Sequence, residues 1–227
     1  MAIKPILFNT EMVRAILDGR KDATRRIVKG FIPDDAVWGY TAFTPKGYIS
    51  CRGYGEKFFK LPCEPGDILY VRESVWQKTG HYLDVDGETK AVWCNEFKYV
   101  ASDEKPETGW NYSWAKRPSI HMPKEAARIW IKVTDVRVER LQSITEEGAI
   151  REGAEGEKCH HINVGAFGCT DCMNTGWIEP PQVGFMQIWN STIKKSDLDR
   201  YGWDANPWVW VIEFERCKKP EKDKRCD

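Results

Sequence analysis

The alternation of apolar and polar residues from Ala127 to Leu141 constrains the fold of this chain more than any other feature. Branched apolar residues recur on both sides of an expected bend, at Ile129, Ile131, Val133, Val136 and Val138. Alternation with a period of two is typical of a strand with one buried face. The segment therefore predicts a long β-strand.

The remaining strands and helices are expected to be short. Strands or hairpins are predicted over 38–51, 68–72, 84–93 and 208–214. Helices are predicted after Thr10 as N-cap and before Gly19, from a capping box at Ser143–Glu146 to Glu152, and over 182–193. Residues 101–116, polar and rich in Gly, Pro and Trp, are predicted to be a loop. This pattern predicts an α+β, mainly β fold with a small barrel and helices at its mouth, not a parallel α/β sheet.

Charge and length narrow the possible function classes. At 227 residues the chain suits one domain with insertions, or one domain with a small appendage. With 34 basic and 34 acidic residues, it is not expected to coat nucleic acid by bulk charge. A basic footprint must be local, and residues 1–30 carry seven Lys/Arg against three Asp/Glu. The basic tail from Arg216 is predicted to be a frayed terminus.

Targeting signals and cysteine usage predict a compartment. No apolar run is long enough to span a membrane, and the N-terminus has no signal-peptide core. The eight cysteines are not arranged as a secreted disulfide scaffold, so a cytoplasmic protein with reduced thiols is expected. Most of the eleven tryptophans are expected to pack in the core, and a few could stack on bases.

A basic loop is expected after the first helix, in the segment Gly-Arg-Lys-Asp-Ala-Thr-Arg-Arg at 19–26. It brings one hydroxyl and four cationic side chains together, those of Arg20, Lys21, Thr24, Arg25 and Arg26. A lysine three residues before a threonine can form a base–nucleophile pair if the lysine loses its proton. The alternative is a solvated basic turn.

The pattern Gly-Arg-Lys-x-x-Thr-x-Arg after a short helix resembles the signature of the ASCH domain, a branch of the PUA-like superfamily. Four further segments resemble the longer ASCH-like proteins of phages and prophages; they cover 4–8, 65–73, 117–123 and 206–214. The resemblance implies a PUA-like barrel domain over 1–216. It leaves 156–180 as an insertion and 217–227 as a flexible basic tail.

The resemblance also implies site residues, by way of ASCH proteins that deacetylate N4-acetylcytidine. Their Lys and Thr correspond to Lys21 and Thr24, and their Glu corresponds to Glu152, with Glu147 as the alternative. The substrate-binding residues would be Arg25, Arg26, Arg72, Glu73 and Arg117. A barrel-rim salt bridge is the alternative for Arg72 and Glu73. His121 is a secondary pocket candidate, or a hydrogen-bonded structural histidine.

Such a set makes chemical sense for an amide on cytosine. Thr24 could attack once Lys21 takes its proton, provided burial or the neighbouring arginines lower the pKa of Lys21, and Glu152 could protonate the leaving amine. Asp22 stands where the deacetylases tend to carry Thr, and its carboxylate could pair with Lys21 and keep it protonated. The alternative is a loop that holds a phosphate or a base without chemistry.

A zinc site is predicted in the insertion. Cys159, His160 and His161 precede a Cys-x-x-Cys pair, Cys169 and Cys172. Three thiolates and one imidazole would form a tetrahedral set for a structural Zn²⁺, which could hold together a segment with almost no core. Unligated surface cysteines, or a redox pair at Cys169 and Cys172, are the alternatives. No organic cofactor is expected.

Three functions are compatible with these observations. The first is hydrolysis of an acyl amide on a modified cytidine or related nucleoside. The second is a non-catalytic RNA- or DNA-binding module, and the third is a ribonuclease that uses the same loop. The expected partners are therefore a modified nucleoside or RNA/DNA, with no membrane, and the sequence does not predict the oligomeric state.

Overall fold

The structure is a computed structural model that describes residues 1–30, 32–53, 55–160 and 176–220. These residues form two compact units, each assembled from separate stretches of the chain. Unit 1 comprises 1–18, 66–132 and the C-terminal stretch from 215, and unit 2 comprises 19–65 and 133–214. In the described residues, no helix is long and apolar enough to cross a membrane.

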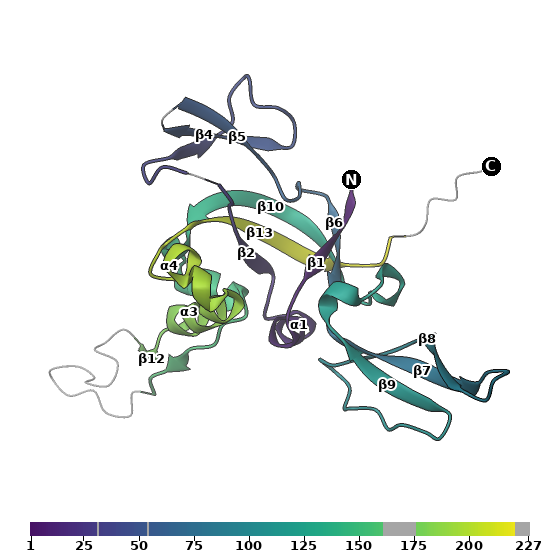
Figure 1. Cartoon of the computed structure of the whole chain (residues 1–227). Coiled ribbons are helices and arrows are strands. Elements are labelled where there is room, and N and C mark those ends of the chain that lie inside the picture. The colour runs from purple at the N-terminus through teal and green to yellow at the C-terminus, as the bar shows by residue number, and fades with distance from the viewer. Residues whose placement is uncertain (31, 54, 161–175, 221–227) are drawn as a thin grey trace. The chain divides into compact units, whose positions relative to one another are not determined.

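Unit 1 contains a parallel strand pair, a helix and a three-stranded antiparallel sheet (Figure 1). Its elements are β1 (Ile3–Leu7), α1 (Thr10–Leu17), β6 (Ile68–Arg72), β7 (Val75–Leu83), β8 (Thr89–Tyr99), β9 (Tyr112–Arg117), η1 (Ser119–His121) and η2 (Lys124–Ala126). β6 pairs with β1 in parallel and with the start of β10 (Trp130–Arg140) antiparallel. β7 lies between β8 and β9. Ile68, Val75, Met122 and Trp130 are among the residues of the core.

Unit 2 carries the rest of β10 and most of β13 (Trp208–Cys217), which lies between β10 and β2. Its other elements are β2 (Ala23–Ile27), β3 (Val37–Gly39), β4 (Tyr48–Gly53), β5 (Gly55–Lys60), η3 (Leu141–Ser143), α2 (Glu146–Arg151), β11 (Glu157–Lys158), β12 (Trp177–Glu179), α3 (Pro181–Thr192), η4 (Lys195–Asp197) and α4 (Leu198–Tyr201). α2 and α3 pack on β13 through a core that includes Ala149, Phe185, Trp189 and Val209.

The predicted α+β, mainly β class is confirmed. The described strands form open sheets, none closed into a barrel, so the PUA-like barrel stays a prediction. The domain boundaries at 216 and 156–180 also stay predictions, and part of the insertion and 221–227 lie outside the described residues. The strand in 127–141, both hairpins and the helix near 182–193 are confirmed.

Three local predictions were wrong. Residues 112–117 are strand β9 rather than loop, since Ser113 and Ala115 pair with β7. The N-cap of α1 is Asn9, whose side chain accepts a hydrogen bond from the Met12 N–H, and Thr10 is the first helical residue. The N-cap of α2 is Thr145, which accepts from the Gly148 N–H, so there is no capping box at Ser143.

The two candidate caps of α1 can be separated by substitution. We expect Asn9→Ala to lower the free energy of unfolding by about 1 kcal/mol, because it leaves the Met12 N–H without its acceptor. Thr10→Ala, the matched control, should leave it within about 0.5 kcal/mol of the wild type. Urea unfolding followed by circular dichroism measures both, and equal costs would contradict the assignment of Asn9.

Candidate functional site

In the segment predicted to be a basic loop, Lys21, Thr24 and Arg25 are buried, whereas Arg20 and Asp22 are exposed. Gly19 has φ +74°, a conformation that glycine adopts without strain, and the backbone of Lys21 then pairs with that of Glu152 as an isolated antiparallel bridge. Strand β2 follows at once. Lys21 is 2% exposed, so the alternative interpretation, a solvated basic turn, was wrong for this residue. The tertiary pairing with Glu152, which lies 131 residues away, takes Lys21 out of solvent.

Helix α2 positions Glu152. The helix begins after the Thr145 cap, and Glu152 is its C-cap residue. Gly153, with φ +86°, ends it. The buried Ala149 anchors the helix in the core of unit 2. Glu152 is 3% exposed, whereas the alternative candidate Glu147 is on the exposed side of the same helix.

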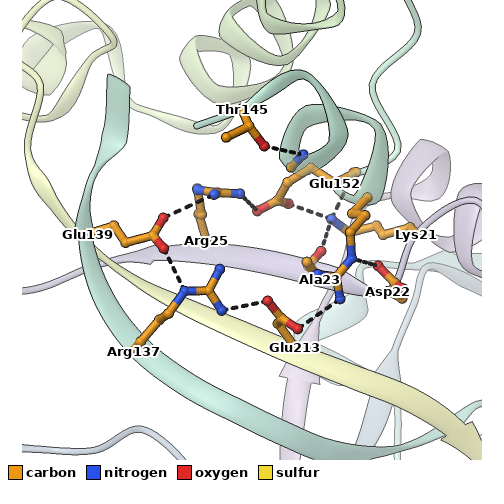
Figure 2. Close-up of polar contacts among 11 residues, drawn as sticks. Lys21, Asp22, Ala23, Arg25, Arg137, Glu139, Thr145, Glu152 and Glu213 are labelled. Atoms are coloured by element: carbon orange, nitrogen blue, oxygen red, sulfur yellow. Dashed lines mark hydrogen bonds and ion pairs between the residues drawn. The ribbon is translucent and has the colours of Figure 1, made fainter. Parts of the chain in front are cut away.

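Lys21 and Glu152 form a buried ion pair (Figure 2). Lys21 Nζ donates to Glu152 Oε2 at 2.6 Å, to the Glu152 carbonyl at 2.8 Å and to the Ala23 carbonyl at 2.7 Å. An ammonium group has three N–H donors, so these three acceptors use all of them. The position of Lys21 Nζ is therefore set by three bonds.

Arg25 contacts the other oxygen of the same carboxylate. Its Nη1 lies 3.2 Å from Glu152 Oε1, and its Nη2 lies 3.4 Å from Glu139 Oε2 on β10. The guanidinium also packs over the ring of Phe185, at 5.8 Å from the centroid. Glu152 thus bridges two buried cations, and Glu139 supplies a second negative charge.

A more exposed chain of alternating charges continues from Glu139. Arg137 donates to Glu139 and to Glu213, Glu213 accepts from Arg151 at 3.0 Å, and Arg151 donates to Asp22 at 2.7 Å. The sequence left open a pairing of Asp22 with Lys21, but Arg151 donates to Asp22 and Lys21 pairs with Glu152. Sequence reasoning missed Arg137, Glu139 and Glu213, although the i, i+2 spacing of the first two on one strand face was a usable signal.

The pKa of Lys21 lies below its ordinary value. Burial is the main cause, because it disfavours the charged amine, and the positive charges of Arg26 and Arg25 act in the same direction. The carboxylate of Glu152 opposes them. Burial likewise lowers the pKa of Arg26, again against the effect of Glu152. The site is a place where a lysine proton is held less firmly than in water.

An open hollow lies next to the ion pair. It has a volume of about 640 Å³ and is lined by Gly19, Arg20, Asp22, Ile150, Arg151, Ala154, Glu155 and Gly156. Lys21 lies between two of these residues in sequence, and Glu152 follows Arg151. Both members of the ion pair are therefore sequence neighbours of residues that line the hollow.

The structure brings together only some of the predicted site residues. Lys21, Arg25 and Glu152 are in direct contact, and Thr24 is buried on β2, opposite Ile212 of β13. Arg72, Glu73, Arg117 and His121 belong to unit 1. There Arg72 donates to the carbonyls of Ile120 and Met122, and Arg128 donates to both oxygens of Glu73.

The last two predicted pocket residues also have local surroundings in unit 1. Arg117 donates to Gln77 Oε1 at 2.6 Å, and its guanidinium lies 4.8 Å from the ring centroid of Trp93. His121 is an exposed residue of η1. Neither observation assigns these residues to a pocket.

The predicted zinc site lies largely outside the described residues. Cys159 is half-buried and His160 exposed, at the end of β11, but His161, Cys169 and Cys172 fall in 161–175. Among the described residues there is no group of three His, Cys, Asp or Glu that could hold a metal ion. The zinc site stays a prediction.

Comparisons with protein-family models, with curated proteins and with solved structures each gave no match. The ASCH resemblance therefore depends on the sequence motifs alone.

Removal of the buried carboxylate should be costly. We expect Glu152→Gln to lower the free energy of unfolding by about 3–5 kcal/mol, because Lys21 and Arg25 lose their shared counter-charge. Lys21→Met should also destabilise, and the double variant should cost less than the sum of the two by about 0.5–3 kcal/mol. Denaturant unfolding of the wild type, the two single variants and the double variant measures this double-mutant cycle. If the losses in free energy of unfolding simply add, the result would contradict a direct ion pair.

Glu213 should contribute to the loss of folding stability at acidic pH. The hydrogen bond from Arg151 lowers the pKa of Glu213 below its ordinary value of 4.5, with a further contribution from Arg137 and against the effect of burial. A lowered carboxyl pKa stabilises the fold above pH 4.5, and the contribution is lost as pH falls through the folded-state pKa.

We therefore expect Glu213→Gln to be less stable than the wild type near neutral pH, and to lose less further stability on acidification. Urea unfolding from about pH 7 to about pH 3 measures this. Glu215→Gln is the matched control, since Glu215 is an exposed neighbour on β13 that pairs with Lys132. Parallel acid limbs for the wild type and Glu213→Gln would contradict the prediction.

Proposed function

We propose that this chain is an ASCH-like protein that hydrolyses an acyl amide on a modified cytidine, with Lys21 and Glu152 as its acid–base pair. The observation that carries the proposal is the buried contact of 2.6 Å between Lys21 Nζ and Glu152 Oε2, together with the lowered pKa of Lys21. A buried titratable group with a lowered pKa and a specific charge partner is typical of functional sites.

The chemistry needs only one proton to move within the pair. Transfer from Lys21 Nζ to Glu152 Oε2 converts an ammonium and a carboxylate into a neutral amine and a neutral carboxylic acid. The amine can then act as a base and the acid as a proton donor. Burial favours the neutral amine of Lys21, because it penalises the charge of the ammonium group.

In the proposed reaction, Thr24 attacks the acyl carbon. The hydroxyl oxygen forms the new C–O bond and its proton passes to Lys21, while the C–N bond of the amide breaks and Glu152 protonates the departing exocyclic amine of cytosine. Water then cleaves the Thr24 ester, which releases the carboxylic acid and restores the threonine. The sum is one amide and one water giving one amine and one acid.

The hollow beside the pair supports a substrate of nucleoside size. Its volume of about 640 Å³ falls in the range of small-molecule pockets. Arg20 and Arg151 line it together with Asp22 and Glu155, so a nucleobase would meet both hydrogen-bond donors and acceptors there. The proposal also includes a PUA-like barrel domain over 1–216 and a zinc site in the 156–180 insertion.

One observation favours a second candidate, binding of a nucleoside or nucleic acid without chemistry. Lys21 Nζ already has three acceptors, and removal of its proton would leave one of them without a donor. A lysine held in this way can serve as a fixed positive charge.

Turnover of N4-acetylcytidine tests the proposal. We expect the wild type to release cytidine and acetate, detected by mass spectrometry. Lys21→Arg should lower turnover by about 10²-fold or more, because arginine does not give up its proton near neutral pH. Thr24→Val, which keeps the shape and removes the hydroxyl, should have a similar effect.

The control is Lys4→Met, which removes another lysine paired with a buried carboxylate, that of Asp67 in unit 1, and should leave turnover unchanged. Thermal melting confirms that each variant is folded. A folded wild type without turnover on any acylated nucleoside, and with nucleoside affinity retained in Lys21→Arg, would favour binding alone. Equal turnover by Lys21→Arg and wild type would remove Lys21 as the base.

A further inference from the structure

One face of the β8–β7–β9 sheet in unit 1 carries alternating lysines and aromatic rings. The strand register places Trp76 opposite both Lys98 and Lys116, Lys78 opposite Trp114, and Tyr82 opposite Lys90. Residues directly opposite each other, and those two apart on one strand, share a face. This lysine–aromatic face comprises Trp76, Lys78, Tyr82, Lys90, Lys98, Tyr112, Trp114 and Lys116.

Three ammonium groups of this face lie over its rings. Lys78 Nζ is 5.0 Å from the ring centroid of Tyr112, Lys98 Nζ is 5.6 Å from that of Trp114, and Lys116 Nζ is 5.9 Å from that of Trp76. These contacts confirm that residues from all three strands share one surface. At exposed sites such cation–π contacts are weak, so a ligand can replace them.

The lysine–aromatic face is the solvent side of the sheet. The opposite face presents Val75, Gln77 and Thr79, which are buried, and Val75 belongs to the core of unit 1. On the lysine–aromatic face, Lys98 and Lys116 are exposed, Tyr82 is 51% exposed, and Trp76, Tyr112 and Trp114 are half-buried. The core cluster that contains Val75 does not include these aromatic residues.

The charge of the face is positive. Lys78 pairs with Glu96 at 2.9 Å, and Lys90 pairs with Asp84 at the turn. In the part of the chain that the structure describes, Lys98 and Lys116 have no acidic partner. Two cations thus remain available to neutralise a negatively charged ligand.

We propose that the lysine–aromatic face binds single-stranded nucleic acid. Unpaired bases can stack on Trp76, Tyr112 and Trp114, while the displaced lysine side chains contact the phosphates. A duplex hides its bases from such rings, and an acidic peptide would use the lysines alone. The proposal is independent of the function proposed for Lys21 and Glu152, which belong to unit 2.

Fluorescence anisotropy with labelled oligo(dT) and oligo(U) of about 12 nucleotides, titrated with the full chain at several salt concentrations, tests this proposal. We expect binding to either strand, and binding at least about tenfold weaker to a duplex of equal length or to oligo-glutamate. Trp114→Ala should weaken binding about tenfold, because one stacking ring is lost. The matched control is Trp110→Ala, since Trp110 is 95% exposed and lies outside the strands.

The double variant Lys98→Gln/Lys116→Gln should reduce the slope of log affinity against log salt by about 1.4, since each phosphate contact on a single strand contributes about 0.7. Lys194→Gln/Lys195→Gln, an exposed pair in unit 2, is the control and should leave the slope unchanged. Equal affinity for duplex and single strand, or equal losses in Trp114→Ala and Trp110→Ala, would overturn the proposal. Lys21→Arg should bind as the wild type does, so failure of the hydrolase proposal remains distinguishable.

Discussion

Burial of the Lys21 ammonium is the constraint around which unit 2 is organised. A charged amine taken out of water is strongly unfavourable unless a counter-charge and hydrogen bonds replace its hydration. The structure meets this demand with one carboxylate and two carbonyls. Because Glu152 must then lie at one fixed point, the C-terminus of α2 has to lie against the start of β2.

The charge chain from Arg25 to Asp22 follows from the same constraint. Glu152 faces two buried cations, so the cluster would carry excess positive charge without Glu139. Arg137, Glu213 and Arg151 then alternate in sign across β10, β13 and α2 (Figure 2). Each element that borders the pair is tied to the next by an ion pair. A lysine held so rigidly is equally suited to a fixed binding charge and to a proton transfer whose geometry must not vary.

The sequence allowed β3, β4, β6, β8, β10 and β13 to be predicted, because alternating apolar residues indicate a strand with one buried face, but it did not predict β1, β2, β5, β7, β9, β11 and β12. It failed where tertiary pairing overrides local composition. Polar residues at 112–117 form β9 because β7 offers a partner, and the neighbouring cap formers Asn9 and Thr10 look alike without the backbone geometry. For Lys21, a solvated basic turn was one of two interpretations, because charge usually indicates exposure. Its burial depends on Glu152, which only the ASCH resemblance, and no pattern around Lys21, connects with it.

The location of the exposed positive charge illustrates the same limit. Residues 1–30 carry seven Lys/Arg against three Asp/Glu, yet two of these cations, Lys21 and Arg25, are buried in ion pairs. Two of the seven positive charges in this stretch are therefore withdrawn from any ligand at the surface. The β8–β7–β9 sheet has acidic residues in its turn, but its register gathers lysines and rings on one face. The net charge of a sequence segment includes buried residues, whereas a ligand contacts only the residues exposed on one face of the folded protein. In this chain, strand pairing decides which cations remain at the surface.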